Sequence, residues 1–377
     1  MKNNSEAAVC IAGLRFDLHG SLPMLNEFVC HSKETGDGQI ICVSEPLFDG
    51  TERTVANHGD IAISVRNDGS WIYVAPAYSD MVQLILSADY KTISLYVENP
   101  QDKMLERVLR CLFRMAFETV AILHLRVSLH SSCIDAGGEA VAFTGVSGIG
   151  KSTRAGAWTQ AVGAQFISGD RPALSIGTDG INVYGVPWDG KEQLFRSVQR
   201  PLKAILDVRR SDSVYLRRLT HEQAQKVLAK QIFVPMWDTN AAAAAIMNIR
   251  KLAGSIPVYR LFCGPDAESA KQAYDILFNN PHGILQEEKD MKIKEGFVLR
   301  NVADEFLVMP TGSNIAKFDG AIALNDVSAF IFEQLKNPVS KEDLLIALLN
   351  EYEVDKETAE KDIDALIAKF NEMGIIE

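Results

Sequence analysis

The stretch that decides the fold is residues 140–153, which read Ala-Val-Ala-Phe-Thr-Gly-Val-Ser-Gly-Ile-Gly-Lys-Ser-Thr. Within it, residues 145–152 carry the full Gly-x-x-x-x-Gly-Lys-Ser pattern of a phosphate-binding loop. The apolar run 140–143 has the length of a strand, and residues 153–162 have the length of a helix and contain no proline. This order of strand, glycine loop and helix is the context that the motif requires, so we predict an α/β core.

The loop also predicts how a nucleotide is held. Its glycines let backbone N–H groups turn inward around a polyphosphate, whose charge faces the positive end of the helix dipole. Lys151 would neutralise the β- and γ-phosphates, and the Ser152 hydroxyl would hold a magnesium ion. The alternative is a glycine-rich turn with a lysine there by chance. The predicted nucleotide-binding residues are Gly145, Val146, Ser147, Gly148, Ile149, Gly150, Lys151, Ser152 and Thr153.

Length and composition bound the class of protein. The chain has 377 residues, 47% hydrophobic and 23% charged, which is typical of a globular protein with two or three domains. It has no apolar run of about eighteen residues and no signal-peptide pattern at residues 1–6, so we expect a cytoplasmic protein with no membrane partner. The six cysteines form no Cys-x-x-Cys pair, and we expect them to be reduced and mostly in the core.

The net charge of −11 is spread unevenly along the chain. Residues 291–377 contain 17 acidic and 9 basic residues, a charge of −8, which leaves −3 for residues 1–290. Such an acidic end argues against nucleic acid as a partner. It is either a solvated helix surface or a docking face for a basic peptide.

The chain before the phosphate loop predicts a β-rich module and a connecting helix, together residues 1–125. Alternating segments at 60–65, 70–74 and 92–97 are separated by turn signals, and no catalytic cluster stands out among them. We expect a structural or substrate-shaping appendage, with a binding role as the alternative. A long helix is predicted over residues 101–128 from apolar positions at three- and four-residue spacing. These positions are Leu105, Val108, Leu109, Leu112, Phe113, Ala116 and Val120.

Two acids compete for a place beside the phosphate loop. The predicted strand 164–171 ends near Asp170, and a carboxylate at such a strand end can bind the magnesium shell or take a hydroxyl proton. Asp207, which ends the apolar run 203–206, is the rival. We favour Asp170, because the strand after a phosphate-loop helix is a common source of this acid.

Several of these residues together carry a family resemblance. Leu129-His130, the following Gly-Gly hairpin, residues 145–153 and Ser168-Gly169-Asp170-Arg171 resemble the core of the HPr serine kinase/phosphorylase family and its HPr-kinase-related relatives. The resemblance covers roughly residues 126–280, within a predicted domain of residues 126–285. It implies a kinase with His130 and Asp170 in the active site. On its own, a histidine in an apolar strand is more often a core residue.

The resemblance has a departure and an extension. Relatives usually carry two adjacent acids at the strand end, whereas Gly169 stands in the first position here, which bears on metal affinity, base strength and any reverse phosphorylase activity. Residues 183–192, which contain Pro187-Trp188-Asp189-Gly190, resemble a segment of the HPr-kinase-related group. This segment is either a turn or a loop that contacts substrate.

A last domain, residues 286–377, is predicted after an exposed charged joint at 286–290. Its pattern is a β-hairpin region (297–308, then 316–324) and helices over 326–335, 341–352 and 356–373, the second opened by Ser340. This order, with the stretch 318–325, is similar to the PqqD-like peptide-recognition domain, a winged helix-turn-helix that binds leader peptides of ribosomally made natural products.

The PqqD resemblance implies where a leader peptide binds. The leader would add as a strand to the sheet edge and pack against the last helix, with main-chain hydrogen bonds giving affinity. The alternative is a winged helix that binds DNA, against which the charge of −8 argues. The implied peptide-binding residues are Ala321, Ile322, Ala323 and Leu324.

Two functions of different classes follow. The first is an ATP-dependent kinase that uses Mg²⁺ and phosphorylates a serine or threonine hydroxyl on a leader-bearing precursor peptide. The second is a nucleotide-gated chaperone that only delivers the peptide to another enzyme, and a small-molecule kinase is a third. His130 and Asp170 supply more chemistry than gating needs, which favours the first. The predicted catalytic residues are His130, Lys151 and Asp170, and the predicted metal ligands are Ser152 and Asp170.

Overall fold

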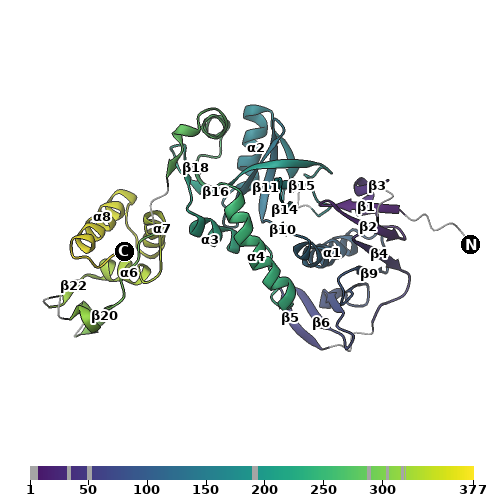
Figure 1. Ribbon diagram of the computed structural model, residues 1–377, viewed down its shortest axis with the longest axis horizontal. Coiled ribbons are helices and arrows are strands. Elements are labelled where there is room, and N and C mark those ends of the chain that lie inside the picture. The colour runs from purple at the N-terminus through teal and green to yellow at the C-terminus, as the bar shows by residue number, and fades with distance from the viewer. Residues whose placement is uncertain are drawn as a thin grey trace, which may run out of the picture. The chain divides into compact units, whose positions relative to one another are not determined.

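The computed structural model describes residues 7–31, 35–48, 53–188, 194–286, 290–302, 305–315, 318 and 320–377 (Figure 1). The chain divides into two compact units, Met1–Gln286 and Glu287–Glu377. Parts of three predicted segments lie outside the described residues, namely 189–192, 287–289 and 316, 317 and 319. In the described part of the chain, no helix has the length and apolar character needed to cross a membrane.

A nine-stranded sheet forms the N-terminal part of the first unit, in the order β3-β1-β2-β4-β9-β8-β7-β6-β5. Helix α1 (Lys103–Leu123) packs its apolar face against this sheet, where the rings of Phe117 and Phe16 lie 5.8 Å apart. The prediction of a β-rich N-terminal module is therefore confirmed. The strands are β1 Ala7–Ile11, β2 Leu14–His19, β3 Val29–Cys30, β4 Gly38–Val43, β5 Thr54–His58, β6 Ile61–Val65, β7 Trp71–Val74, β8 Val82–Leu86 and β9 Thr92–Val97.

The predicted helix over residues 101–128 is too long at its carboxyl end. Helix α1 begins after Asp102, whose side chain accepts hydrogen bonds from two backbone N–H groups of the first turn, and it ends at Leu123. Leu125 then adopts a left-handed conformation with φ +58°, which a helix cannot contain. The chain continues as β10 (Arg126–Ser128), paired antiparallel with β14 (Ala173–Gly177).

The expectation that all six cysteines are reduced is wrong for Cys10 and Cys30, which form a disulfide. The two residues meet because β3 pairs antiparallel with β1, a neighbour relation that cysteine spacing does not reveal. The core expectation holds for only some of the others. Buried free cysteines in the described chain are Cys133 and Cys263, and half-buried ones are Cys42 and Cys111.

The phosphate loop belongs to a second sheet, ordered β10-β14-β15-β16-β12-β11-β13, which β18, β17 and β19 extend. β12 (Glu139–Thr144) lies between antiparallel β11 (Ser131–Ala136) and parallel β16 (Gln199–Arg210). The predicted Gly-Gly hairpin joins β11 to β12, and both glycines have positive φ, as a tight hairpin turn requires. The other strands are β13 Gln165–Ser168, β15 Gly180–Tyr184, β17 Tyr215–Arg218, β18 Val258–Cys263 and β19 Leu285–Gln286.

Helices cover both faces of this second sheet, so β12 is buried on both sides. Val141 and Phe143 pack in the core that contains α2 (Lys151–Val162) and α5 (Ala267–Tyr274). Ala140 and Ala142 pack in the opposite core, with α3 (His221–Gln231) and α4 (Thr239–Ser255). The alternation follows from the two-residue period of a strand.

Helix α4 joins the two sheets of the first unit. The Asn248 amide on α4 donates a hydrogen bond of 2.8 Å to the buried carbonyl of Ile122 on α1. Asp238, which caps α4, accepts a hydrogen bond of 2.9 Å from the Tyr90 hydroxyl of the N-terminal part. The N-terminal part therefore packs directly against the phosphate-loop core.

The second unit has the element order that the sequence predicts. Its three-stranded sheet runs β20-β21-β22, so β20 and β22 are the edges, and Phe332 and Phe370 lie in its helical core. Ser340 caps the second helix, accepting a hydrogen bond from the Asp343 N–H at 3.2 Å. The elements are β20 Phe297–Val302, β21 Glu305–Pro310, β22 Ile322–Leu324, α6 Asp326–Gln334, α7 Lys341–Glu351 and α8 Lys356–Glu372.

Candidate functional site

The phosphate loop turns directly from β12 into α2. Gly145, Gly148 and Gly150 have φ of +136°, +78° and +94°, which residues with a side chain rarely adopt. The Lys151 ammonium donates to the carbonyls of Gly145 at 3.2 Å and Val146 at 3.4 Å, so it lies over the loop. The loop thus has the backbone geometry that lets N–H groups gather around a phosphate.

The buried Arg154 of α2 holds the phosphate loop by hydrogen bonds, a role that the sequence motif does not reveal. Its guanidinium donates to the Ile149 carbonyl at 2.8 Å and to the Cys263 carbonyl at 3.0 Å. A Cβ on Gly150 would come within 2.7 Å of the same guanidinium, so this position requires glycine. Arg154 therefore ties the loop to the end of β18.

A pocket of about 490 Å³ opens beside Arg154. It lies between the phosphate loop, the end of β16 and the segment after β18. Arg210 borders it and donates to the Gly148 carbonyl at 3.3 Å. The lining residues are Gly148, Ile149, Gly150, Thr153, Arg154, Arg210, Ser211, Asp212, Cys263, Gly264 and Pro265.

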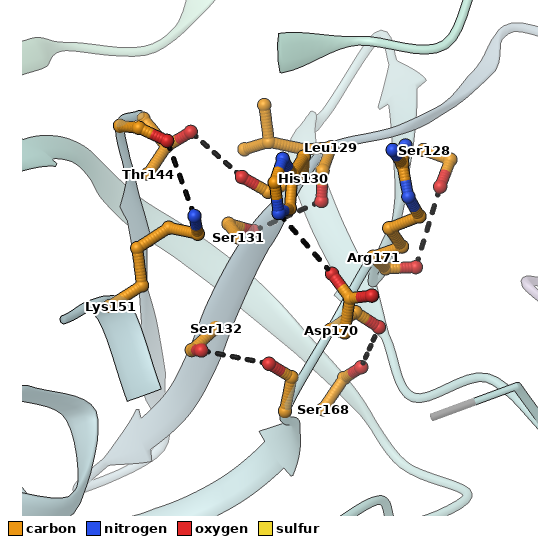
Figure 2. Close-up of polar contacts among 12 residues, drawn as sticks. Ser128, Leu129, His130, Ser131, Ser132, Thr144, Lys151, Ser168, Asp170 and Arg171 are labelled. Carbon is orange, nitrogen blue, oxygen red and sulfur yellow. Dashed lines mark hydrogen bonds and ion pairs between the residues drawn. The ribbon is translucent and has the colours of Figure 1, made fainter. Parts of the chain in front are cut away.

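His130 and Asp170 come together opposite Lys151 (Figure 2). His130 precedes β11, and hydrogen bonds hold its backbone on both sides: its N–H donates to the Gln231 carbonyl at 2.8 Å, and its carbonyl accepts from the Thr144 hydroxyl at 2.9 Å. Its Nε2 lies 3.9 Å from Asp170 Oδ1. The side chains are 30% and 40% exposed, so both are open to a substrate.

The charges of this group act on one another. Burial lowers the pKa of His130, and the nearby cations Lys151, Arg171 and Arg114 lower it further, against the opposing pull of Asp170. Burial also lowers the pKa of Lys151, while Asp170 raises it. The His130 imidazole is therefore biased to its neutral form, and Lys151, His130 and Asp170 form one electrostatic group.

The strand end that carries Asp170 is held by side chains that donate to consecutive carbonyls. Ser132 Oγ donates to the Gly169 carbonyl and Ser168 Oγ to the Asp170 carbonyl, both at 2.8 Å (Figure 2). The Gly169 N–H donates to the Leu194 carbonyl at 2.8 Å. The backbone that presents Asp170 is thus fixed by groups that the sequence pattern did not single out.

Asp207 has quite different surroundings. Asp207 ends the apolar run 203–206 but not its strand, because β16 continues to Arg210 through its pairing with β18. Its carboxylate is 3% exposed, lies 2.8 Å from the Arg209 guanidinium and 3.8 Å from that of Arg260. It faces the base of the phosphate loop, 3.5 Å from where a Cβ on Gly145 would stand. Asp207 is therefore a buried carboxylate at the base of the phosphate loop, and its charge is balanced by neighbouring arginines.

The residues present fit a magnesium ion that a nucleotide brings with it. Ser152 is exposed at the start of α2, and the Asp170 carboxylate is near enough to raise the pKa of Lys151. Among the described residues, no group of three or more His, Cys, Asp or Glu side chains could hold a metal ion by itself. Mg²⁺ commonly binds through one or two protein groups plus phosphates and water, so this sparse set suits it.

The predicted peptide-binding residues lie at an open sheet edge of the second unit. Among the described residues of this unit, β22 pairs only with β21, through Ile322 opposite Val308 and Leu324 opposite Phe306. Ala321 and Ala323 are exposed, whereas Leu324 is buried. The edge therefore offers backbone groups to an added strand.

Comparisons with known proteins bear on the second unit first. Residues 305–376 match the family model described as coenzyme PQQ synthesis protein D (PqqD), so the predicted PqqD domain is confirmed at the carboxyl end. The winged helix-turn-helix description stays a prediction. No curated protein sequence matches the chain.

Three solved structures are similar to parts of the chain. TbiB1 in complex with the TbiA(beta) leader peptide is 22% identical over 23% of this chain and 94% of that one, with a TM-score of 0.20. Lasso peptide synthetase B1 complexed with the leader peptide is 25% identical over 23% and 98%, also with a TM-score of 0.20. The Hpr(Ser) kinase/phosphatase from Coxiella burnetii is 12% identical over 41% and 95%, with a TM-score of 0.23. TM-scores of this size do not establish a shared fold.

Proposed function

We propose that the protein is an ATP-dependent kinase that phosphorylates a serine or threonine hydroxyl of a ribosomally made precursor peptide. The observation that carries the proposal is the meeting of Lys151, His130 and Asp170 at the mouth of the phosphate loop. A phosphate-loop lysine with an exposed acid and a neutral histidine is suited to phosphoryl transfer to a hydroxyl. The PqqD match at residues 305–376 supports a peptide as the substrate.

The reaction uses these residues in defined roles. The loop and Lys151 bind the β- and γ-phosphates of ATP, and Mg²⁺, when held by Ser152 and Asp170, would neutralise phosphate charge. The peptide hydroxyl oxygen attacks the γ-phosphorus while the bond to the β–γ bridging oxygen breaks and ADP leaves. The hydroxyl proton passes to the Asp170 carboxylate, whose Oδ1 lies 3.9 Å from His130 Nε2.

The second unit supplies the peptide in this account. The leader adds as a strand to the open edge at residues 321–324 and packs toward α8, while the core of the peptide reaches the phosphate loop. Linking the two sites on one chain raises the effective concentration of the hydroxyl. Peptides that share a leader could therefore be substrates despite different core sequences.

The proposal is tested by incubating the protein with ATP, Mg²⁺ and a leader-bearing precursor, and detecting phosphopeptide by mass spectrometry. We expect phosphorylation with the native protein and none with Lys151→Ala, because the variant loses the charge that neutralises the phosphates. Leader affinity, measured by fluorescence anisotropy, should be nearly equal in both, since the leader binds residues 321–324. Native-rate transfer by Lys151→Ala would show that the loop is wrongly assigned.

One observation favours the chaperone as a second candidate. The strand end has Gly169 where relatives usually carry an acid, and that backbone is committed to a hydrogen bond with the Leu194 carbonyl. A site with a single acid could bind ATP and gate peptide delivery without transfer. Nucleotide-dependent leader release without phosphopeptide would support this function instead.

A further inference from the structure

Arg171, directly after Asp170, has a backbone conformation that needs a reason. Its φ is +50°, in the left-handed region that a residue with a Cβ rarely adopts. Two side chains hold it there, because the Ser128 hydroxyl and the Trp188 indole N–H both donate to its carbonyl, at 3.4 and 3.3 Å. Strained backbone that the surroundings enforce in this way is concentrated at functional sites.

The Arg171 side chain belongs to the surroundings of His130. Figure 2 shows its guanidinium extending from the strand end on the side of the His130 ring. The side chain is half-buried, and among the described residues no acceptor forms a hydrogen bond or ion pair with the guanidinium. Arg196 and Arg200, by contrast, both lie against the Asp135 carboxylate, at 3.7 and 2.7 Å. Arg171 thus keeps its five donors free for another partner.

The position of this charge indicates what the partner is. In the view of Figure 2, His130 and Asp170 lie between the Lys151 ammonium on one side and the Arg171 guanidinium on the other. The two cations face only the single carboxylate of Asp170, so the group keeps a net positive charge that attracts a further anion. A phosphoryl group, which arginine binds through two parallel hydrogen bonds, matches this arrangement.

We propose that Arg171 binds the terminal phosphoryl group of the nucleotide and stabilises the charge on its equatorial oxygens during transfer. The inference rests on the proposed function for the identity of the nucleotide. Arg171 forms no bond to phosphorus and gives up no proton; it acts through its charge and donors alone. The hydrogen bonds to its carbonyl fix the backbone from which the guanidinium extends, which reduces part of the cost of ordering this residue.

The test compares two nucleotides that differ at this phosphate. ADP and the non-hydrolysable analogue AMP-PNP, each with Mg²⁺, are titrated into full-length protein by calorimetry. The variants are Arg171→Gly, which suits the positive φ and removes the guanidinium, and Arg171→Lys, which keeps the charge but not the paired donors. Arg218→Gln, at an exposed position of β17, is the control that removes one positive charge elsewhere in the same unit.

We expect Arg171→Gly to weaken AMP-PNP binding by about tenfold and ADP binding by about twofold at most, with Arg171→Lys between. Transfer to the precursor should fall by about a hundredfold or more. The melting temperature of Arg171→Gly should not fall, because glycine relieves the strain, and Arg218→Gln should match the native protein throughout.

Equal weakening of both nucleotides, or no change in either, would overturn the proposal. A fall in melting temperature with the loss of binding would assign Arg171 a structural role instead. A native protein that binds both nucleotides but phosphorylates no precursor contradicts the proposed function, while the nucleotide comparison still decides the role of Arg171. A native protein that binds neither nucleotide overturns both.

Discussion

Asp170 and Asp207 are the two acids that compete for a catalytic role beside the phosphate loop, and their surroundings differ. Asp170 is 40% exposed and lies beside His130, whereas Asp207 is buried against Arg209 and Arg260. We predict that Asp170→Asn lowers phosphoryl transfer by about two orders of magnitude or more, because it removes a base or metal ligand without changing shape. Its melting temperature should be close to native, since the side chain is 40% exposed.

Asp207→Asn is the matched comparison for Asp170→Asn. Removing this carboxylate takes a negative charge away from the buried Arg260 guanidinium, which costs about 3–5 kcal/mol in the free energy of unfolding. Urea unfolding of the two variants should therefore separate a stable, inactive Asp170→Asn from a destabilised Asp207→Asn. A stable Asp207→Asn with the larger loss of transfer would give the catalytic role to Asp207.

The pKa of His130 predicts a pH dependence. Burial and the neighbouring cations lower this pKa from its ordinary value of 6.5, so protonation sets in only at lower pH. If the neutral imidazole positions Asp170, transfer falls as pH drops through the lowered pKa, and the acid limb of the rate profile has its midpoint below 6.5. His130→Gln should remove that limb. A midpoint above 6.5, or an unchanged limb in His130→Gln, would contradict the assignment.

Some of these residues could be predicted from the sequence and others could not. The phosphate loop and Asp170 follow from spacing, because a loop and a strand end are local features. Arg154 was missed, since its role depends on Cys263, far along the chain. Arg171 was missed as well, because no pattern reports a positive φ at a residue other than glycine. The Cys10–Cys30 bond likewise depends on which strands become neighbours.

At the scale of elements, the edge strand β22 carries the prediction about leader binding. Successive residues of a strand direct their N–H groups to opposite sides, so of Ile322→Pro and Ala323→Pro one removes an outward donor and the other a bond to β21. The variant that loses the outward donor should weaken leader affinity by about tenfold or more, with its circular dichroism unchanged. Asn301→Pro on β20, the opposite edge, is the control.

The outcome of this comparison depends on which edge the leader uses. Native leader affinity in both β22 variants, measured by fluorescence anisotropy, would exclude that edge. A loss in Asn301→Pro equal to that in the β22 variants would point to general damage to the three-stranded sheet. Both results are distinguishable from loss of folding, because the melting temperature is measured on the same samples.

Elements were predicted best where local signals agree. The capped helices of the second unit have their starts at Ser340 and Asp355, where the side chain accepts a hydrogen bond from the first turn. The end of α1 was misplaced because apolar residues continue past Leu123 into β10, so periodicity alone shows no stop. β16 extends beyond the apolar run 203–206 because β18 pairs with it as far as Arg210.

At the scale of the whole molecule, the packing of the N-terminal part on the phosphate-loop core could not be predicted from the sequence. It depends on α4, whose Asn248 and cap Asp238 reach α1 and Tyr90 across long stretches of chain. By contrast, the division near residue 286 coincides with a charged, proline-containing segment that signals a joint. The predicted boundary between residues 125 and 126 lies inside the first compact unit.

The central claim is that a kinase site and a leader-binding domain act on the same peptide, and one kinetic measurement tests it most directly. Phosphoryl transfer is measured for the native chain and for a variant lacking residues 291–377, each with a leader-bearing precursor and with its leaderless core fragment. If the two sites act together because they are linked on one chain, the deletion raises the Michaelis constant for the precursor by about tenfold or more. It hardly changes transfer to the fragment. Equal losses on both peptides, in a truncated protein that keeps its circular dichroism, would contradict the claim.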